Sequence, residues 1–306
     1  MHRLGAALAF AFGLAALAAP RPARALDKQG SAHGGNVGGE ADDGFHASGS
    51  LMFGSALYNP TYAARPDNTG RALFRYAAHV DLDLIGRKLS IPLDLNVFTD
   101  RERRGALIFA PTELDVIGGL TSTWNAGPGA IEFGSRVEHD RPVDRSGFTQ
   151  TYVDARTRYL YSLAQIAPGI GPALEGGDVS GWLTLGWFAL NPTYAARPDN
   201  TGLALLRYAL HVEVSAFDDL ISLGLDGTTF TDRRASNVLR PTELDLTPEI
   251  IVRSAPFEVH LAYERDMPLD RGGLVQSFAY VLGVWSFDLK RPQPRPLEER
   301  TQIVSP

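Results

Sequence analysis

The sequence contains an internal duplication, and this feature constrains the fold more than any other. Residues 59–70 and 191–202 both read NPTYAARPDNTG without a single change. The separation between matched blocks falls from 132 to 126 residues along the chain, so short deletions lie between them. A unit of this length is far longer than a solenoid repeat, so each copy must hold several secondary-structure elements. Further matched pairs are FTDR at 98–101 and 230–233, PTELD at 111–115 and 241–245, and D-x-P-x-D-R at 140–145 and 266–271.

The two ends of the chain differ in composition from the duplicated body. A short basic start, an apolar run over residues 4–19 and a small-x-small cleavage site at 23–25 predict an export signal over residues 1–25. Residues 26–47 are rich in Gly, Asp and His, and we expect a flexible lead-in there. Residues 290–306 are rich in proline and charge, which predicts a disordered tail. The chain has no Cys, so no disulfide framework supports the fold.

The body between these ends alternates apolar and polar residues with period two, which is typical of β-strands. Over residues 72–84, for example, apolar side chains alternate with Arg75, His79, Asp81 and Asp83. The same alternation returns in the second copy around Arg207. It predicts an all-β fold of six strands per copy, at residues 48–58, 71–85, 89–99, 113–124, 130–139 and 149–163, then 180–190, 203–216, 220–231, 243–254, 257–265 and 274–289.

The length of the strands and of their connections favours a membrane barrel over a soluble sheet. Several alternating stretches reach the roughly 9–11 residues that a transmembrane strand needs. Short links, such as 217–219 and 255–256, alternate with longer links rich in Arg, Asp and Pro. Short turns on one side and long loops on the other are typical of outer-membrane barrels.

On these features, residues 48–289 resemble the bacterial outer-membrane β-barrel (porin-like) class. The resemblance implies a 12-stranded antiparallel transmembrane β-barrel, built from two tandem six-stranded repeats at 48–165 and 178–289. It closes because a sheet in lipid leaves no unpaired edge. The implied location is the outer membrane of a Gram-negative bacterium, with outer-membrane lipid as the partner. The long loops would then face outward and both termini would lie in the periplasm.

In such a barrel the polar face of each strand lines the interior, because a charge at the membrane midplane costs several kcal/mol. Two outcomes are open: a narrow polar channel, or side chains that interlock and seal the bore. The last strand is apolar on both faces, so either a hydrophobic patch lies inside or a terminal segment packs there. The predicted lumen-lining residues are Arg75, His79, Asp81, Asp83, Asp94, Glu132, Arg136, Glu138, Arg207, His211, Glu213, Asp226, Glu258 and Glu264.

The duplicated motifs also place charged residues in the long loops, at one rim of the barrel. Turn chemistry accounts for NPTYAARPDNTG, and a ligand or partner surface is the alternative. For the acidic and basic residues we expect Arg–carboxylate pairing between loops. A calcium site is the weaker alternative, because no EF-hand spacing supports it. The predicted rim residues are Arg65, Asp67, Asp100, Arg101, Glu113, Arg197, Asp199, Asp232, Arg233 and Glu243.

No catalytic motif, cofactor motif or metal motif accompanies these residues. The chain resembles the outer-membrane phospholipase in strand count, but that enzyme's Ser, two residues after its His, is replaced here by Asp81 and Glu213. The sequence therefore predicts that the protein is not an enzyme and holds no cofactor. A net charge of −6 without a basic patch argues against nucleic acid as a partner. The predicted function is a passive channel for small polar solutes or ions, or a sealed structural barrel; adhesion through the duplicated loops, or less favourably hydrolysis, is the alternative.

Overall fold

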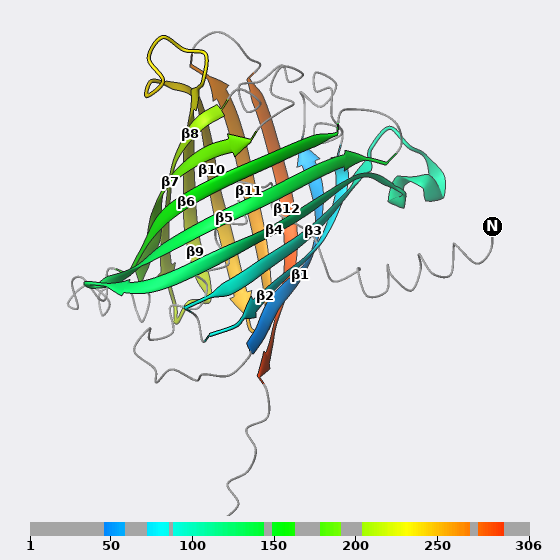
Figure 1. The fold of residues 1–306 in the computed structure, drawn as a ribbon. Coiled ribbons are helices and arrows are strands. Elements are labelled where there is room, and N and C mark those ends of the chain that lie inside the picture. Colours follow the sequence, from blue (N-terminus) through cyan, green and yellow to red (C-terminus); the bar gives the residue numbers. More distant parts are fainter. Residues whose placement is uncertain are drawn as a thin grey trace, which may run out of the picture.

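The protein forms a closed barrel of twelve antiparallel strands in which every strand pairs with its neighbours in sequence and β1 pairs with β12 (Figure 1). The computed structural model describes residues 46–58, 72–85, 88–143, 149–162, 178–190, 204–269 and 275–290. The prediction of a 12-stranded antiparallel barrel is confirmed. The strands are β1 (His46–Tyr58), β2 (Ala72–Asp83), β3 (Ser90–Asp100), β4 (Pro111–Ala126), β5 (Gly129–Pro142), β6 (Gln150–Ser162), β7 (Val179–Leu190), β8 (Ala204–Ala216), β9 (Ile221–Asp232), β10 (Pro241–Ser254), β11 (Phe257–Pro268) and β12 (Gln276–Lys290).

Apart from the long link between β6 and β7, which joins the two halves at the same end as the short turns, short and long links lie at opposite ends of the barrel. The end that carries the turns 127–128, 217–220 and 255–256 is called the turn end here, and β1 begins and β12 finishes there. The opposite end, where β3 leads into β4 and β9 into β10, is called the loop end. The link between β3 and β4 carries a short 3-10 helix, η4 (Gly105–Phe109), which projects to the side of the barrel at the upper right of Figure 1.

The seam between β1 and β12 closes slightly beyond the predicted strand limits. His46 precedes the expected start at 48, and its imidazole lies 3.0 Å from Asp83 on β2 and 2.5 Å from Asp288 on β12. These contacts tie three strands together at the turn end, which explains why strand pairing continues to His46 and Lys290.

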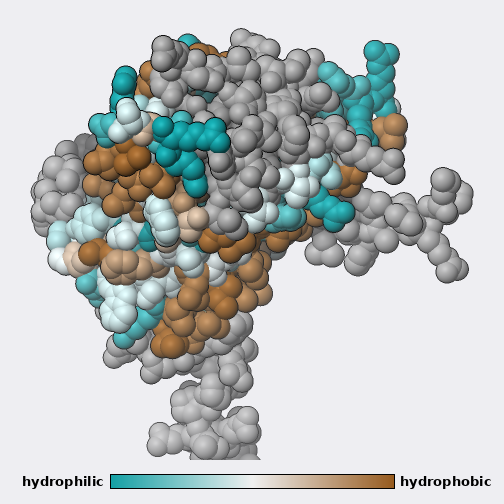
Figure 2. Space-filling view, turned by 45° about the horizontal axis from the view of Figure 1, so that its top comes forward, coloured by the Kyte–Doolittle hydropathy of each residue, from teal (hydrophilic) through white to brown (hydrophobic). Residues whose placement is uncertain are grey.

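The barrel has the polarity of a membrane protein: apolar outside and polar inside. Along β5, Phe133 and Val137 are exposed on the outer wall, whereas Glu132 and Arg136 between them are buried. Figure 2 shows apolar side chains over much of the described outer wall. A water-soluble chain does not expose so continuous an apolar wall while burying its charges. The chain is therefore a transmembrane β-barrel with the architecture of bacterial outer-membrane proteins. In the described residues, no helix is long and apolar enough to span a membrane.

Matched positions of the duplicated sequence occupy matched positions in the barrel. His79 lies opposite Asp94 across β2 and β3, and His211 lies opposite Asp226 across β8 and β9. The seams match as well. Gly49 on β1 faces Phe287 on β12, and Gly181 on β7 faces Tyr161 on β6. The contacts that close the barrel thus repeat those that join its two halves.

Candidate functional site: the barrel interior

The fourteen residues predicted to line the lumen all belong to the polar, inward face of their strands. Eleven of them are buried: Arg75, His79, Asp83, Asp94, Glu132, Arg136, Glu138, Arg207, His211, Asp226 and Glu264. The other three are half-buried and contact interior partners. Asp81 lies 2.8 Å from His79, Glu213 lies 2.7 Å from Arg253, and Glu258 lies 3.1 Å from His260.

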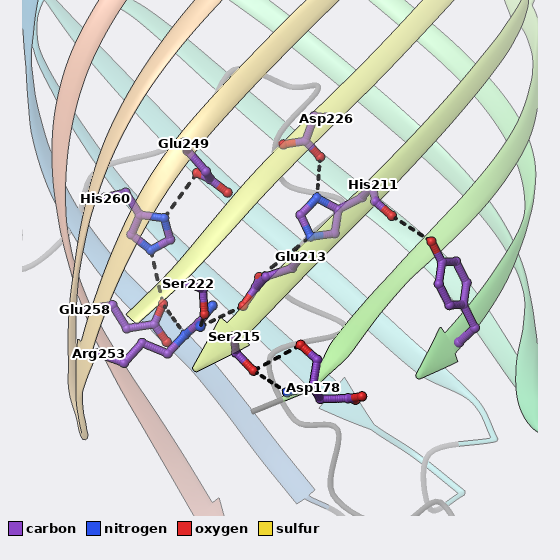
Figure 3. A network of polar contacts seen from close by, with 11 residues as sticks. Asp178, His211, Glu213, Ser215, Ser222, Asp226, Glu249, Arg253, Glu258 and His260 are labelled. Carbon is purple, nitrogen blue, oxygen red and sulfur yellow. Dashed lines mark hydrogen bonds and ion pairs between the residues drawn. The ribbon is translucent and has the colours of Figure 1, made fainter. Parts of the chain in front are cut away.

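One continuous network crosses β8, β9, β10 and β11 towards the turn end (Figure 3). Glu213 lies in the middle of this network and connects the His211 side with the Arg253 side. Its carboxylate is 3.7 Å from His211 Nε2 and 2.7 Å from the Arg253 guanidinium. On one side, His211 Nδ1 lies 2.9 Å from Asp226. On the other side, Arg253 contacts Ser222 and lies 3.6 Å from Glu258. His260 lies 3.1 Å from Glu258 and 3.3 Å from Glu249. Each of the two imidazoles is held between two carboxylates, which fixes the orientation of both rings.

The first half holds its histidine in the same way but surrounds it differently. His79 lies 2.5 Å from Asp94 and 2.8 Å from Asp81, matching the contacts of His211. The neighbouring strand supplies Ser50 opposite His79 and Trp182 opposite His211. Trp182 is 1% exposed, stacks on His211 with the ring centroids 5.7 Å apart, and lies under the guanidinium of Arg158 at 5.0 Å. A large ring thus fills the interior in one half where the other half has a hydroxyl.

The β5–β6 wall of the interior is charged. Arg136 lies 2.9 Å from Asp154 and 3.4 Å from Glu138. Arg156 and Arg158 lie 3.8 and 3.5 Å from Glu132.

The matching β11–β12 wall is largely apolar. Ala262 and Tyr280 occupy the register position that Arg136 and Asp154 occupy on β5 and β6. Ala262, Phe278, Tyr280 and Leu282 form one buried cluster, and Val284 packs on Met52 and Ala77 in another. Of the two alternatives for the last strand, the hydrophobic patch inside is present, whereas the terminal segments lie outside the described residues.

Near the loop end the interior carries two matching groups of carboxylates. Glu113, Asp115, Glu138 and Asp140 on β4 and β5 are all buried, and their counterparts Glu243, Asp245, Glu264 and Asp266 on β10 and β11 are buried as well. Asp115 lies directly across from Asp140, and Asp245 lies directly across from Asp266. Asp115 Oδ1 accepts no hydrogen bond from any described residue. Arg75 on β2 interacts electrostatically with Glu113 and Asp115 of the first group and with Glu264 of the second.

The residues predicted at the rim divide into strand residues and loop residues. Asp100, Glu113, Asp232 and Glu243 lie within strands at the loop end and are buried. Arg101 donates to the carbonyl of Ala72 at 3.2 Å, and Arg233 donates to the carbonyl of Ala204 at 2.8 Å. Arg65, Asp67, Arg197 and Asp199 lie outside the described residues. Arg–carboxylate pairing between the loops therefore stays a prediction, as do the roles of the duplicated motif.

The predicted lumen set omits the inward residues Asp115, Asp140, Asp245 and Asp266, because their motifs are assigned to the loop rim; Asp140 and Asp266 also lie one residue beyond the predicted strands 130–139 and 257–265. Period-two alternation carries the signal: exposed Val116 separates buried Asp115 from buried Ile117. The predicted set also omits inward-facing Trp182 and Met52, which are apolar residues on an otherwise polar face. In the described part of the chain, no three His, Asp or Glu side chains are placed to hold a metal ion. The predicted lack of catalytic activity stays a prediction.

Among the described buried side chains, carboxylates outnumber basic groups, although Arg156 and Arg253, which are half-buried, also contact interior carboxylates. Among the described residues sixteen Asp and Glu side chains are buried, against four Arg and three His. A buried charge costs several kcal/mol unless a partner compensates it, so buried carboxylates need basic side chains, hydrogen-bond donors, cations, protons or water. A buried polar atom without a protein partner likewise needs a hydrogen bond from water or another ligand.

Comparison with known proteins shows similarity of fold and nothing about function. No protein-family model and no curated protein matches the sequence. Among solved structures, LpxR from Salmonella typhimurium is 9% identical with a TM-score of 0.43, and the match covers 78% of this chain and 99% of that one. The translocator domain of autotransporter NalP from Neisseria meningitidis is 10% identical with a TM-score of 0.37, covering 87% and 97%. The COG4313 outer membrane channel from Pseudomonas putida F1 is 13% identical with a TM-score of 0.38, covering 79% and 95%. The chain is similar to these barrels in architecture, and its function must be argued from its own interior.

Proposed function

We propose that this protein is a narrow, cation-preferring channel of the outer membrane. The observation that carries the proposal is the excess of buried carboxylates over buried Arg and His in the described interior. Carboxylate rings favour cation entry in channels. The paired acids at the loop end, Asp115 with Asp140 and Asp245 with Asp266, would form the entrance that concentrates cations.

The burial of basic side chains in the interior limits which solutes can pass. Arg158 is 2% exposed, and His211 and His260 are each 1% exposed, so the turn-end half of the bore is filled by protein at these residues. A pore wide enough for a sugar would leave such side chains in contact with water. The solutes are therefore small cations rather than nutrients of sugar size.

A sealed structural barrel is the second candidate, and the continuous network around Glu213 and Arg253 favours it. Ion pairs that interlock from β8 to β11 would have to open for any ion to pass. The two candidates differ in one measurable property, which is conductance.

The test is single-channel recording of the full-length protein in planar bilayers under a KCl gradient. We expect small steps and a reversal potential that reports a preference for K⁺ over Cl⁻. Replacing all four entrance aspartates by asparagine should lower that preference, whereas the matched control Asp218→Asn, in an exposed turn at the opposite end, should not. The absence of steps in protein that shows a folded, heat-modifiable gel band would overturn the channel and leave the sealed barrel. Anion preference would overturn the role of the carboxylates.

A further inference from the structure

The link between β3 and β4 differs in character from every other described link. It begins with a basic run, Arg101-Glu102-Arg103-Arg104, and continues into η4, whose sequence GALIF is wholly apolar. No residue of η4 is buried: Leu107 is 61% exposed and Phe109 is 47% exposed. An exposed apolar helix is stable only beside other apolar matter.

Stacked aromatic rings hold this segment against the outer wall of the barrel. Phe109 stacks on Phe74 of β2 with the centroids 5.3 Å apart and the planes 7° apart. Phe74 in turn stacks on Phe53 of β1 at 5.7 Å. Because Phe53 belongs to the apolar outer face, the row of rings places η4 beside the hydrocarbon rather than over the mouth of the barrel. In Figure 1, η4 accordingly projects sideways.

The basic run lies immediately before the apolar helix and is anchored to the strand ends. Asp100 accepts a hydrogen bond from the Glu102 N–H at 2.8 Å, and Arg101 donates to the carbonyl of Ala72. Arg103 is half-buried and Arg104 is exposed. Guanidinium groups bind phosphate in a bidentate manner, and basic residues next to an apolar anchor are attracted to anionic headgroups.

The second copy of the link provides an internal comparison. Asp232 and Arg233 make the same contacts as Asp100 and Arg101, with the Arg234 N–H and the Ala204 carbonyl. Residues 233–240 nevertheless form no helix, and the link stands upright at the top of Figure 1. The second link also carries arginines, Arg234 and Arg240, but among the described residues the combination of a basic run and an apolar helix is present in the first copy only.

We infer that Arg103, Arg104, Leu107, Phe109 and Phe53 form a binding surface for an anionic, phosphorylated glycolipid of the outer leaflet. The arginines would hold the phosphate and the apolar side chains would pack on the acyl chains. The inference rests on placement of the loop end in the outer leaflet and is independent of whether the barrel conducts.

The test is native mass spectrometry of the full-length barrel in detergent, titrated with diphosphoryl lipid A and with its monophosphoryl form. We expect tighter binding of the diphosphoryl form, and binding weakened roughly tenfold or more by the double substitution Arg103→Gln/Arg104→Gln. Leu107→Ser/Phe109→Ser should weaken both lipids. Arg234→Gln/Arg240→Gln and Val238→Ser/Leu239→Ser, on the matched link, are the controls and should bind as the unmodified protein does.

Two outcomes would overturn the inference. One is equal binding by the arginine variant and the unmodified protein, with both showing the folded gel band. The other is a dimer in detergent that Phe109→Ser dissociates without changing lipid binding, since this would make the surface a contact between two copies of the chain.

Discussion

Asp115 on β4 lies directly across from Asp140 on β5, inside the barrel, and both side chains are buried. Like charges directly opposite each other on neighbouring strands destabilise a sheet. Under the proposed cation preference, these carboxylates are the groups that would draw cations to the loop end. Asp245 and Asp266 repeat the arrangement in the second half.

Replacing Asp115 by Asn should therefore stabilise the barrel. We expect a gain of about 0.2–1 kcal/mol, because the substitution removes repulsion across the strand pair. The gain can be measured as a shift of the urea unfolding midpoint in detergent. The control is Asp154→Asn, which removes a carboxylate that faces Arg136 and should destabilise the barrel instead. Destabilisation by Asp115→Asn would mean that protein cations already balance this carboxylate.

Replacing Arg136 alone should strongly destabilise the barrel. Arg136→Ala leaves Asp154 and Glu138 without the guanidinium that lies between them, at a cost of about 3–5 kcal/mol. The second half already shows a solution for this position, since Ala262 faces Tyr280 there. The double substitution Arg136→Ala/Asp154→Tyr, which copies that pair, should recover most of the loss. If the double variant is no more stable than Arg136→Ala, the two walls are not interchangeable.

The glycines at the two matching seams should not tolerate a side chain. A Cβ at Gly49 would lie 2.1 Å from the carbonyl oxygen of His79, and one at Gly181 would lie 2.0 Å from that of His211. Gly49→Ala and Gly181→Ala should each cost about 1–3 kcal/mol through overpacking, measured by the temperature at which the folded gel band disappears. Gly283→Ala, whose Cβ meets nothing closer than 3.8 Å, is the control and should leave that temperature unchanged.

Exchanging the residues beside the two central histidines should change conductance in opposite directions. Trp182→Ser removes the ring that stacks on His211 and should cost about 3–5 kcal/mol of stability while enlarging the bore. Ser50→Trp places a ring beside His79 and should narrow it. Single-channel steps larger than those of the unmodified protein for Trp182→Ser, and smaller for Ser50→Trp, are the expected result. Unchanged steps in both variants would show that ions do not pass this level.

Much of the fold can be read from period-two alternation. It predicts the strand count, the sidedness of residues such as Phe133 and Glu132, and the alternation of short and long links, because a strand exposes successive side chains to opposite faces. It fails where a functional motif overlaps a strand. The alternation predicts a strand from residue 113, while the motif PTELD suggests a charged loop rim; Glu113 and Asp115 in fact lie in β4 and are buried. The acidic pairs near the loop end are absent from the predicted lumen for this reason.

By itself, the sequence determined the duplication, the apolar outer face and the polar inner face, since these are local properties of each strand. The tertiary structure alone decided which inward residues meet. His46 and Asp288 are 242 residues apart and touch only because the sheet closes on itself with one particular register. The registers of neighbouring strands set Asp115 against Asp140, Arg136 against Asp154, and Ala262 against Tyr280. Register depends on the pairing of all twelve strands at once, and so no single strand's pattern contains it.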